Sequence, residues 1–433
     1  MPGECTGEQL SALLDGDARF ALIDVREPME YNAAHIPGAS LIPRRRLEFE
    51  VCRALPYKGV QVVLCDENGR NAARAALTLV RGGYTDVSVL KGGVNRWAAD
   101  GRPTEWGVNV PSKTFGEEIE LEHDVPTISA DELHERIERG DKLVILDTRT
   151  PEEFQRLCIP GGRSVPGGEL ALRIADIRAE AAGDATVIVN CAGRTRSIIG
   201  TRLLQRMGVE DLYGLENGTA GWALAGYELE ANADRTGMPE PSAEGASEAE
   251  RFARHVADED GVQLIDVTKL RELIREQGEE TVYVVDVRLR DEFRTGHIPG
   301  SSWMPGGQAV QTADATAVVH NAPVVFICDG VTRAAIAGSW YRQMGKSEVY
   351  ALDGGTVAWT HAGFDLVGDA EESGSDRETV LGLDVALSRN REISVEDLTS
   401  DSSRTVLFVG TSAEFAAGHV PDASWVSRGV LED

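Results

Sequence analysis

The chain has 433 residues, 42% of them hydrophobic and 26% charged, which suits roughly three globular domains. Its 43 basic and 71 acidic residues give a formal net charge of -28. That balance argues against nucleic acid or an anionic membrane surface as the main partner. The opening residues, MPGECTGEQL, lack the basic and apolar segments of a signal peptide, and no run of about 18 apolar residues occurs. We therefore expect a cytoplasmic protein.

The cysteine content argues against a disulfide framework and against a zinc site. The six cysteines are Cys5, Cys52, Cys65, Cys158, Cys191 and Cys328. They are sparse, and none forms the CxxC pair that zinc sites use. We expect individual thiols in a reducing compartment, with no metal and no cofactor.

An apolar run, an acidic-aromatic stretch and an (H/C)-(I/V)-P turn recur four times. The copies begin at Leu22, Ile145, Val284 and Leu407. The first three share an Asp-x-Arg pair at matching places. These pairs are Asp24/Arg26, Asp147/Arg149 and Asp286/Arg288. We expect them to form hydrogen bonds within each repeat, and we expect the turn histidines His35, His297 and His419 to be structural.

The first three copies continue with an apolar run that ends at a cysteine, a helix-like stretch that stops at a glycine, and a turn followed by tryptophan. The tryptophans are Trp97, Trp222 and Trp359. Continuous apolar strands that alternate with helices predict an α/β fold, in which a parallel sheet has helices on both faces.

The repeats divide the chain into four predicted domains. Their boundaries are 1–105, 125–232, 261–368 and, for a partial and degenerate fourth copy without cysteine, 380–433. We expect the fourth copy to be loosely ordered or docked on a neighbour and to contribute no catalysis. The polar and acidic segments between the domains, 103–124, 231–260 and 368–379, are predicted to be solvated connectors.

Three loops share one pattern, in which a strand ends at a cysteine, four residues intervene, and an arginine precedes a helix. The pairs are Cys65/Arg70, Cys191/Arg196 and Cys328/Arg333. A thiol at the carboxyl end of a parallel strand faces the ligand crevice. Backbone N–H groups of a short loop and the following helix N-terminus stabilise an anion there. This pattern predicts a thiolate nucleophile that could also form a persulfide.

The DVRxxxEY/F…HIPGA motif, the Cys-x4-Arg loop and the GG-x3-W ending resemble the rhodanese family of sulfurtransferases over nearly the whole chain. The resemblance implies a five-stranded parallel sheet in each domain. It also implies a cysteine that accepts sulfane sulfur from a donor such as thiosulfate and passes it to cyanide or a thiol. By position, the persulfide carriers would be Cys65, Cys191 and Cys328, and a sulfur-carrier protein is a possible partner.

Two other functions remain open. A cysteine phosphatase or arsenate reductase of the same fold is expected to have one more residue between cysteine and arginine, so the four-residue spacing disfavours it. A non-enzymatic scaffold or sulfur-relay protein is favoured by the acidic side chains of Asp66, Glu67 and Asp329, which would repel an anionic donor.

The charges of the three loops predict which cysteine is most active with thiosulfate. The second loop, Cys191-Ala-Gly-Arg-Thr-Arg, contains Arg194 and Arg196 and no acid. Two guanidinium groups can hold the oxygens of thiosulfate. We therefore predict that Cys191 carries most of the thiosulfate activity, with Arg194 and Arg196 binding the donor. Cys65 and Cys328, with Arg70 and Arg333 as their substrate-binding arginines, are predicted to be weaker or to serve other donors.

Overall fold

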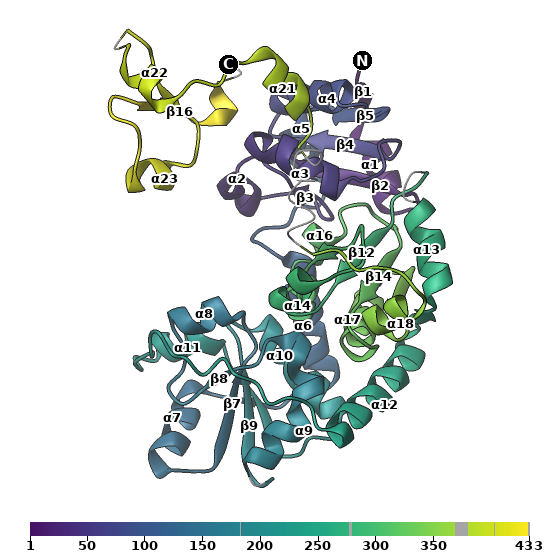
Figure 1. Cartoon of the computed structure of the whole chain (residues 1–433), viewed down its shortest axis with the longest axis vertical. Coiled ribbons are helices and arrows are strands. Elements are labelled where there is room, and N and C mark those ends of the chain that lie inside the picture. Colours follow the sequence, from purple (N-terminus) through teal and green to yellow (C-terminus); the bar gives the residue numbers. More distant parts are fainter. Residues whose placement is uncertain (182, 277–278, 369–379, 402, 432–433) are drawn as a thin grey trace. The chain divides into compact units, whose positions relative to one another are not determined.

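The computed structural model describes residues 1–181, 183–276, 279–368, 380–401 and 403–431, and Figure 1 shows the whole chain. Three five-stranded parallel sheets and one two-stranded sheet form within these residues. The chain divides into two compact units, Met1–Trp106 with Ser373–Asp433, and Gly107–Glu372. Among the described helices, none is both long and apolar enough to cross a membrane.

The first repeat forms the larger part of the first unit. Its elements are β1 (Gly3–Cys5), α1 (Gly7–Leu14), β2 (Phe20–Asp24), α2 (Pro28–Ala33), β3 (Ser40–Leu41), η1 (Arg44–Arg46), α3 (Leu47–Ala54), β4 (Gln61–Cys65), α4 (Arg70–Arg81), β5 (Asp86–Leu90) and α5 (Gly93–Ala99). The strands lie in the order β1-β5-β4-β2-β3. Strand β2 is buried at every residue. That burial explains why its sequence is continuously apolar up to Asp24.

The last segment of the chain packs on the first repeat. Its elements are α21 (Leu383–Arg389), α22 (Val395–Thr399), β16 (Leu407–Phe408), α23 (Ser412–Ala417), β17 (Ser424–Trp425) and η3 (Arg428–Val430). Arg428 forms an ion pair with Glu48 over 3.2 Å and lies 4.8 Å above the ring of Phe49. The backbone N–H of Leu381 donates to the carbonyl of Glu48.

The second repeat belongs to the second unit. Its elements are β6 (Thr127–Ile128), α7 (Ala130–Arg139), β7 (Leu143–Asp147), α8 (Pro151–Arg156), β8 (Arg163–Ser164), η2 (Gly167–Glu169), α9 (Leu170–Glu180), β9 (Thr186–Asn190), α10 (Thr195–Arg206), β10 (Leu212–Leu215) and α11 (Gly218–Leu224). The strand order is β6-β10-β9-β7-β8, the same arrangement as in the first sheet.

The third repeat completes the second unit. Its elements are β11 (Gln263–Ile265), α13 (Val267–Glu276), β12 (Tyr283–Asp286), α14 (Arg290–Thr295), β13 (Ser302–Trp303), α15 (Gly306–Gln311), α16 (Ala313–Thr316), β14 (Val324–Ile327), α17 (Thr332–Gln343), β15 (Val349–Leu352) and α18 (Gly355–His361). The order β11-β15-β14-β12-β13 repeats the topology once more, and helices cover both faces of the sheet (Figure 1). The expected fold class is therefore confirmed.

Two of the predicted connectors are helices, so that part of the prediction is wrong. Helix α6 (Val110–Glu122) buries Phe115 and Ile119 against α10, and α12 (Ala243–Asp260) packs along α9 and α17 (Figure 1). Small residues such as Ala249 and Ala253 line the buried face of α12. Their burial was hidden by the acidic residues on the other face, which dominate the composition of the segment. Within the third connector, 369–379 lie outside the described residues.

The recurring Asp-x-Arg pairs form buried contacts in each of the first three repeats, as expected. In the first repeat Arg26 donates to both carboxylate oxygens of Asp24 and, over 2.7 Å, to the carbonyl of Ala34. His35 stacks on Tyr31, and its Nδ1 lies 3.0 Å from the carbonyl oxygen of Tyr31. A carbonyl oxygen only accepts, so Nδ1 carries the proton. These side chains are buried and make intradomain contacts, which leaves them structural.

Candidate functional site

The three cysteine loops leave the carboxyl ends of β4, β9 and β14, the central strand of each sheet. The pairing register differs in the first loop. Asp24 pairs with Cys65, whereas the matching Asp147 and Asp286 pair with Asn190 and Ile327. Cys65 is thus the last residue of its strand, while Cys191 and Cys328 come one residue later.

Asp66 therefore occupies the place that the other two loops give to cysteine. Its carbonyl accepts a 2.8 Å hydrogen bond from Val94, as the carbonyl of Cys191 does from Thr219. The carbonyl of Cys328 accepts one of the same length from Thr356. The expected equivalence of Cys65 with the other cysteines is wrong, because the matching Cys-x4-Arg spacing is shifted by one residue against the sheet.

The arginine of the first loop is shifted in the same way. Counting from Asp66, Asn71 stands where the other loops have Arg196 and Arg333. Arg70 begins helix α4, at the position of Thr195 in α10. The first loop thus lacks both the cysteine and the arginine at the positions that define the other two loops.

Cys65 lies in the hydrophobic core of the first repeat, packed among Leu22, Val63 and Leu90. Its side chain is fully buried. Burial, together with the neighbouring carboxylate of Asp24, raises the pKa of Cys65 far above its ordinary value. The thiol is therefore protonated at neutral pH.

The carboxylate of Asp66 fills the backbone cradle of the first loop. It accepts hydrogen bonds from the N–H groups of Asn68 at 3.1 Å, Asn71 at 2.6 Å and Ala72 at 3.2 Å, and from the N–H of Gly69. Four converging N–H groups form a site for an anion. The loop geometry thus holds an anion as expected, but in the first repeat the protein's own side chain occupies it.

The second loop presents the same cradle around Cys191. The thiol is 2% exposed, and its Sγ donates to the hydroxyl of Ser197, 3.6 Å away. The Ser197 hydroxyl in turn donates to the carbonyl of Arg194 over 2.7 Å. By the register, the N–H groups of Gly193 and Ser197 correspond to those of Asn68 and Ala72, which hold the Asp66 carboxylate. Ser197 gave no signal in the sequence, because a single serine in a helix is common.

The two arginines of the second loop have different surroundings. Arg196 is buried and donates to both carboxylate oxygens of Glu153, at 2.9 and 3.1 Å. Burial would raise the pKa of Glu153, but its hydrogen bonds and ion pair with Arg196 outweigh burial and lower it. The side chain of Arg194 is 48% exposed and pairs with Glu120 of helix α6. Of the two, Arg194 is the one that solvent and a ligand can reach.

A polar cavity lies beside the Cys191 loop. Its polar lining consists of Glu120, Thr127, Arg194, Ser197, Glu216 and Asn217. Arg194 and Ser197 belong to the loop and the first turn of α10, and Glu216 and Asn217 follow β10. The cavity therefore lies at the carboxyl ends of the strands, where parallel sheets bind ligands.

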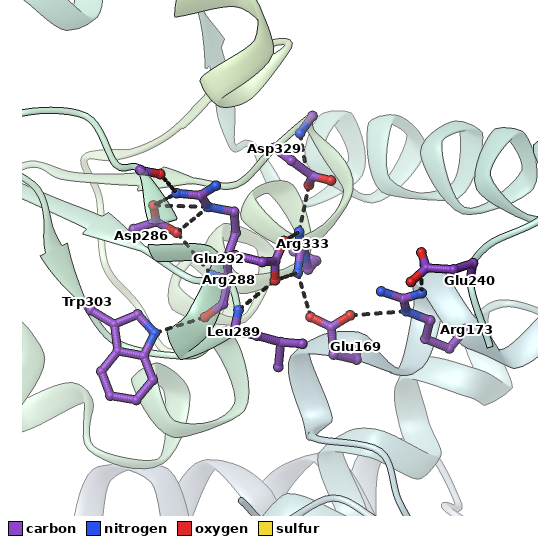
Figure 2. A network of polar contacts seen from close by, with 12 residues as sticks. Glu169, Arg173, Glu240, Asp286, Arg288, Leu289, Glu292, Trp303, Asp329 and Arg333 are labelled. Carbon is purple, nitrogen blue, oxygen red and sulfur yellow. Dashed lines mark hydrogen bonds and ion pairs between the residues drawn. The ribbon is translucent and has the colours of Figure 1, made fainter. Parts of the chain in front are cut away.

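The third loop is enclosed by charged groups. Arg333 is 2% exposed and donates to Glu292, Asp329 and Glu169, as Figure 2 shows. Glu169 comes from η2 of the second repeat, and Arg173 donates to its other oxygen over 3.3 Å. Both terminal nitrogens of the Arg333 guanidinium are thus engaged by protein carboxylates.

The thiol of the third loop is buried as well. Cys328 is fully buried, and burial raises its pKa to about 12, although Arg333 and the N–H groups of Gly330 and Ala334 act in the opposite direction. A thiol with a raised pKa is predominantly protonated at neutral pH. The third loop therefore has the cradle of a reactive site around a fully buried thiol.

The other cysteines are packed or peripheral. Cys158 is buried with Phe154 and Ala233, and Arg235 lies 3.9 Å from its Sγ. Cys5 belongs to the core of the first repeat, and Cys52 is half-buried on α3. None of the three lies at the carboxyl end of a central strand.

Comparison with known proteins identifies the domain type. Residues 6–100, 129–225 and 251–362 match the family described as Rhodanese-like domain. A crystal structure of a thiosulfate sulfurtransferase from Pseudomonas aeruginosa is similar with a TM-score of 0.85 and 36% identity, covering 99% of this chain and 79% of that one.

Two curated proteins match shorter stretches of the chain. The thiosulfate sulfurtransferase GlpE of Pseudomonas aeruginosa is 33% identical over 88 residues, which are 20% of this chain and 78% of GlpE. The probable adenylyltransferase/sulfurtransferase MoeZ of Mycobacterium tuberculosis is 35% identical over 99 residues, 23% of this chain. The matched stretch spans only 25% of MoeZ.

Proposed function

We propose that this chain, which belongs to the rhodanese-like domain family, is a sulfurtransferase whose working cysteine is Cys191. The observation that carries this proposal is the difference between the three loops. The cradle around Cys191 holds a thiol next to a polar cavity, whereas Asp66 fills the first cradle and three carboxylates enclose the arginine of the third.

The reaction follows from that arrangement. The Cys191 thiolate attacks the sulfane sulfur of thiosulfate, the S–S bond of the donor breaks, and sulfite leaves with the electron pair. The persulfide on Cys191 is an anion, and the backbone N–H groups of the loop and the N-terminus of α10 stabilise it. Cyanide or a thiolate then attacks the outer sulfur, and the Cys191 thiolate is released.

Arg194 is the residue we assign to donor binding. Its guanidinium lines the cavity and is half exposed, so it can hold the sulfonate oxygens of thiosulfate. Arg196 was expected to share this role, but its hydrogen bonds to Glu153 assign it to holding the loop. Arg70 and Arg333 have no place in donor binding in this proposal.

The first and third repeats act as structural and interaction modules in this proposal. Asp66 blocks the first cradle, and Cys328 is buried with a pKa of about 12. This assigns the scaffold function, the alternative that the acidic loops suggested, to two repeats of the chain. We further propose that the domains are 1–105, 125–232 and 261–368, with 380–433 as a partial fourth, and that the protein works in the cytoplasm with its cysteines reduced.

Mass spectrometry after incubation with thiosulfate tests the assignment. The intact protein should gain one sulfur atom, and peptide mapping should place it on Cys191. The Cys191→Ser variant should gain none. A stable persulfide on Cys65 or Cys328, with Cys191 unmodified, would contradict the proposal.

A further inference from the structure

The cavity beside Cys191 combines charges of both signs. The guanidinium of Arg194 and the carboxylates of Glu120 and Glu216 line it together. Arg194 and Glu120 pair with each other, and Thr127 donates to one oxygen of Glu216 over 3.1 Å. With one positive and two negative groups in the lining, an acceptor that carries only negative charge can pair with Arg194 but leaves Glu216 without a cationic partner.

One residue of the cavity lining contacts the reactive thiol directly. Ser197 lines the cavity, and its hydroxyl lies 3.6 Å from the Sγ of Cys191. Arg194 belongs to the same loop as Cys191. A small molecule held by Arg194 and Glu216 would therefore lie on the side of the loop where Ser197 contacts the Cys191 thiol.

We propose, building on the assignment of Cys191 as the persulfide carrier, that this cavity selects a small zwitterionic aminothiol as acceptor. The acceptor's carboxylate binds Arg194, which sulfite has vacated, and its ammonium binds Glu216. When the acceptor's carboxylate displaces Glu120 from Arg194, Glu120 is also able to turn to the ammonium. Each charge of the cavity then has a partner of opposite sign, which neither an anionic nor a neutral thiol provides.

The transfer step is balanced without another reagent. The acceptor's thiolate attacks the outer sulfur of the Cys191 persulfide and forms a new S–S bond. The bond between that sulfur and the Cys191 Sγ breaks, and its electron pair stays on Cys191 as thiolate. The product is the persulfide of the aminothiol.

The test compares cysteine with 3-mercaptopropionate, which has the same thiol and carboxylate but no ammonium. With thiosulfate as donor, kcat/KM is measured for both acceptors in the full-length protein and in the Glu216→Gln variant. Loss of one charge-assisted hydrogen bond should lower the ratio of cysteine to 3-mercaptopropionate by roughly tenfold. Using the ratio cancels the different intrinsic reactivities of the two thiols.

Glu210→Gln is the matched control, since Glu210 is exposed in the same repeat and does not line the cavity. It should keep the wild-type ratio. A Glu216→Gln variant with an unchanged ratio would overturn the inference. Turnover with cyanide as acceptor tests the proposed function separately, because cyanide needs the Cys191 persulfide but no charged partner in the cavity. Normal cyanide turnover with an unchanged acceptor ratio would therefore refute only the acceptor site.

Discussion

The guanidinium of Arg333 donates to the carboxylate of Glu169 over 2.7 Å, across 164 residues of sequence. Both side chains are 2% exposed. The arginine comes from the cysteine loop of the third repeat and the glutamate from η2 of the second. The loop arginine of the third repeat therefore serves in the contact between the two repeats.

Replacing Arg333 with methionine should destabilise the second unit by about 3 kcal/mol, because it leaves the buried Glu169 and the partly exposed Glu292 and Asp329 without their common cation. Arg254→Met is the control, since its ion pair with Asp353 is exposed and should cost less than about 1 kcal/mol. Chemical denaturation followed by tryptophan fluorescence measures both. If both variants lost the same small free energy of unfolding, Arg333 would not stabilise the contact between the second and third repeats.

The stability of the first unit should fall as pH rises from 4.5 to 7. Burial, with a hydrogen bond to Glu30, raises the pKa of Glu67 from 4.5 to about 7. An acid with a raised pKa in the folded state contributes stability below its unfolded pKa and loses it as pH passes the folded value. Glu67→Gln should remove this dependence, as measured by hydrogen exchange of the α4 amides at pH 5 and pH 8 after correction for intrinsic rates. Glu8→Gln, an exposed substitution, should leave the wild-type pH dependence in place.

Glu120→Gln should lower the KM for thiosulfate, because Glu120 competes with the donor for Arg194. We expect a decrease of roughly 1.5-fold to fivefold, the range for an exposed charged pair. Steady-state kinetics with cyanide as acceptor measure it. An increase in KM would show that Glu120 supports donor binding and does not compete with it.

Asp66→Ala should destabilise the first unit by about 1 to 2 kcal/mol, because the carboxylate caps N–H groups at the start of α4. It should leave sulfur transfer unchanged, because the proposed catalytic cysteine is in the second repeat. Thermal unfolding and the thiosulfate assay on the same preparation check both parts. A loss of turnover would mean that the first loop takes part in catalysis.

The repeat pattern predicts the fold because each apolar run is a central strand that is buried on both faces. The shift at Cys65 was also visible in the sequence. Cys191 and Cys328 precede their tryptophans by 31 residues, as Asp66 precedes Trp97, whereas Cys65 precedes it by 32. The spacing to the arginine concealed this, because Arg70 happens to follow Cys65 at the same distance.

Other parts of the site could not be predicted from local pattern. Glu120 lies on a helix that the composition suggested was a connector, and it meets Arg194 only after α6 packs on α10. Glu169 reaches Arg333 from another repeat. The residues of the second loop alone carry a net positive charge. In the folded protein Arg194 and Arg196 each pair with a carboxylate from a distant element, so the charge around the loop is less positive than its sequence suggests.

Thiosulfate:cyanide turnover of the single Cys→Ser variants tests the central claim most directly. Cys191→Ser should lose roughly 10³-fold or more, as expected when a nucleophile is removed. Cys328→Ser and Cys65→Ser should stay within about twofold of the wild type, since burial raises the pKa of both thiols and disfavours the thiolate. Wild-type rates for Cys191→Ser, with activity abolished in Cys328→Ser or Cys65→Ser, would contradict the account.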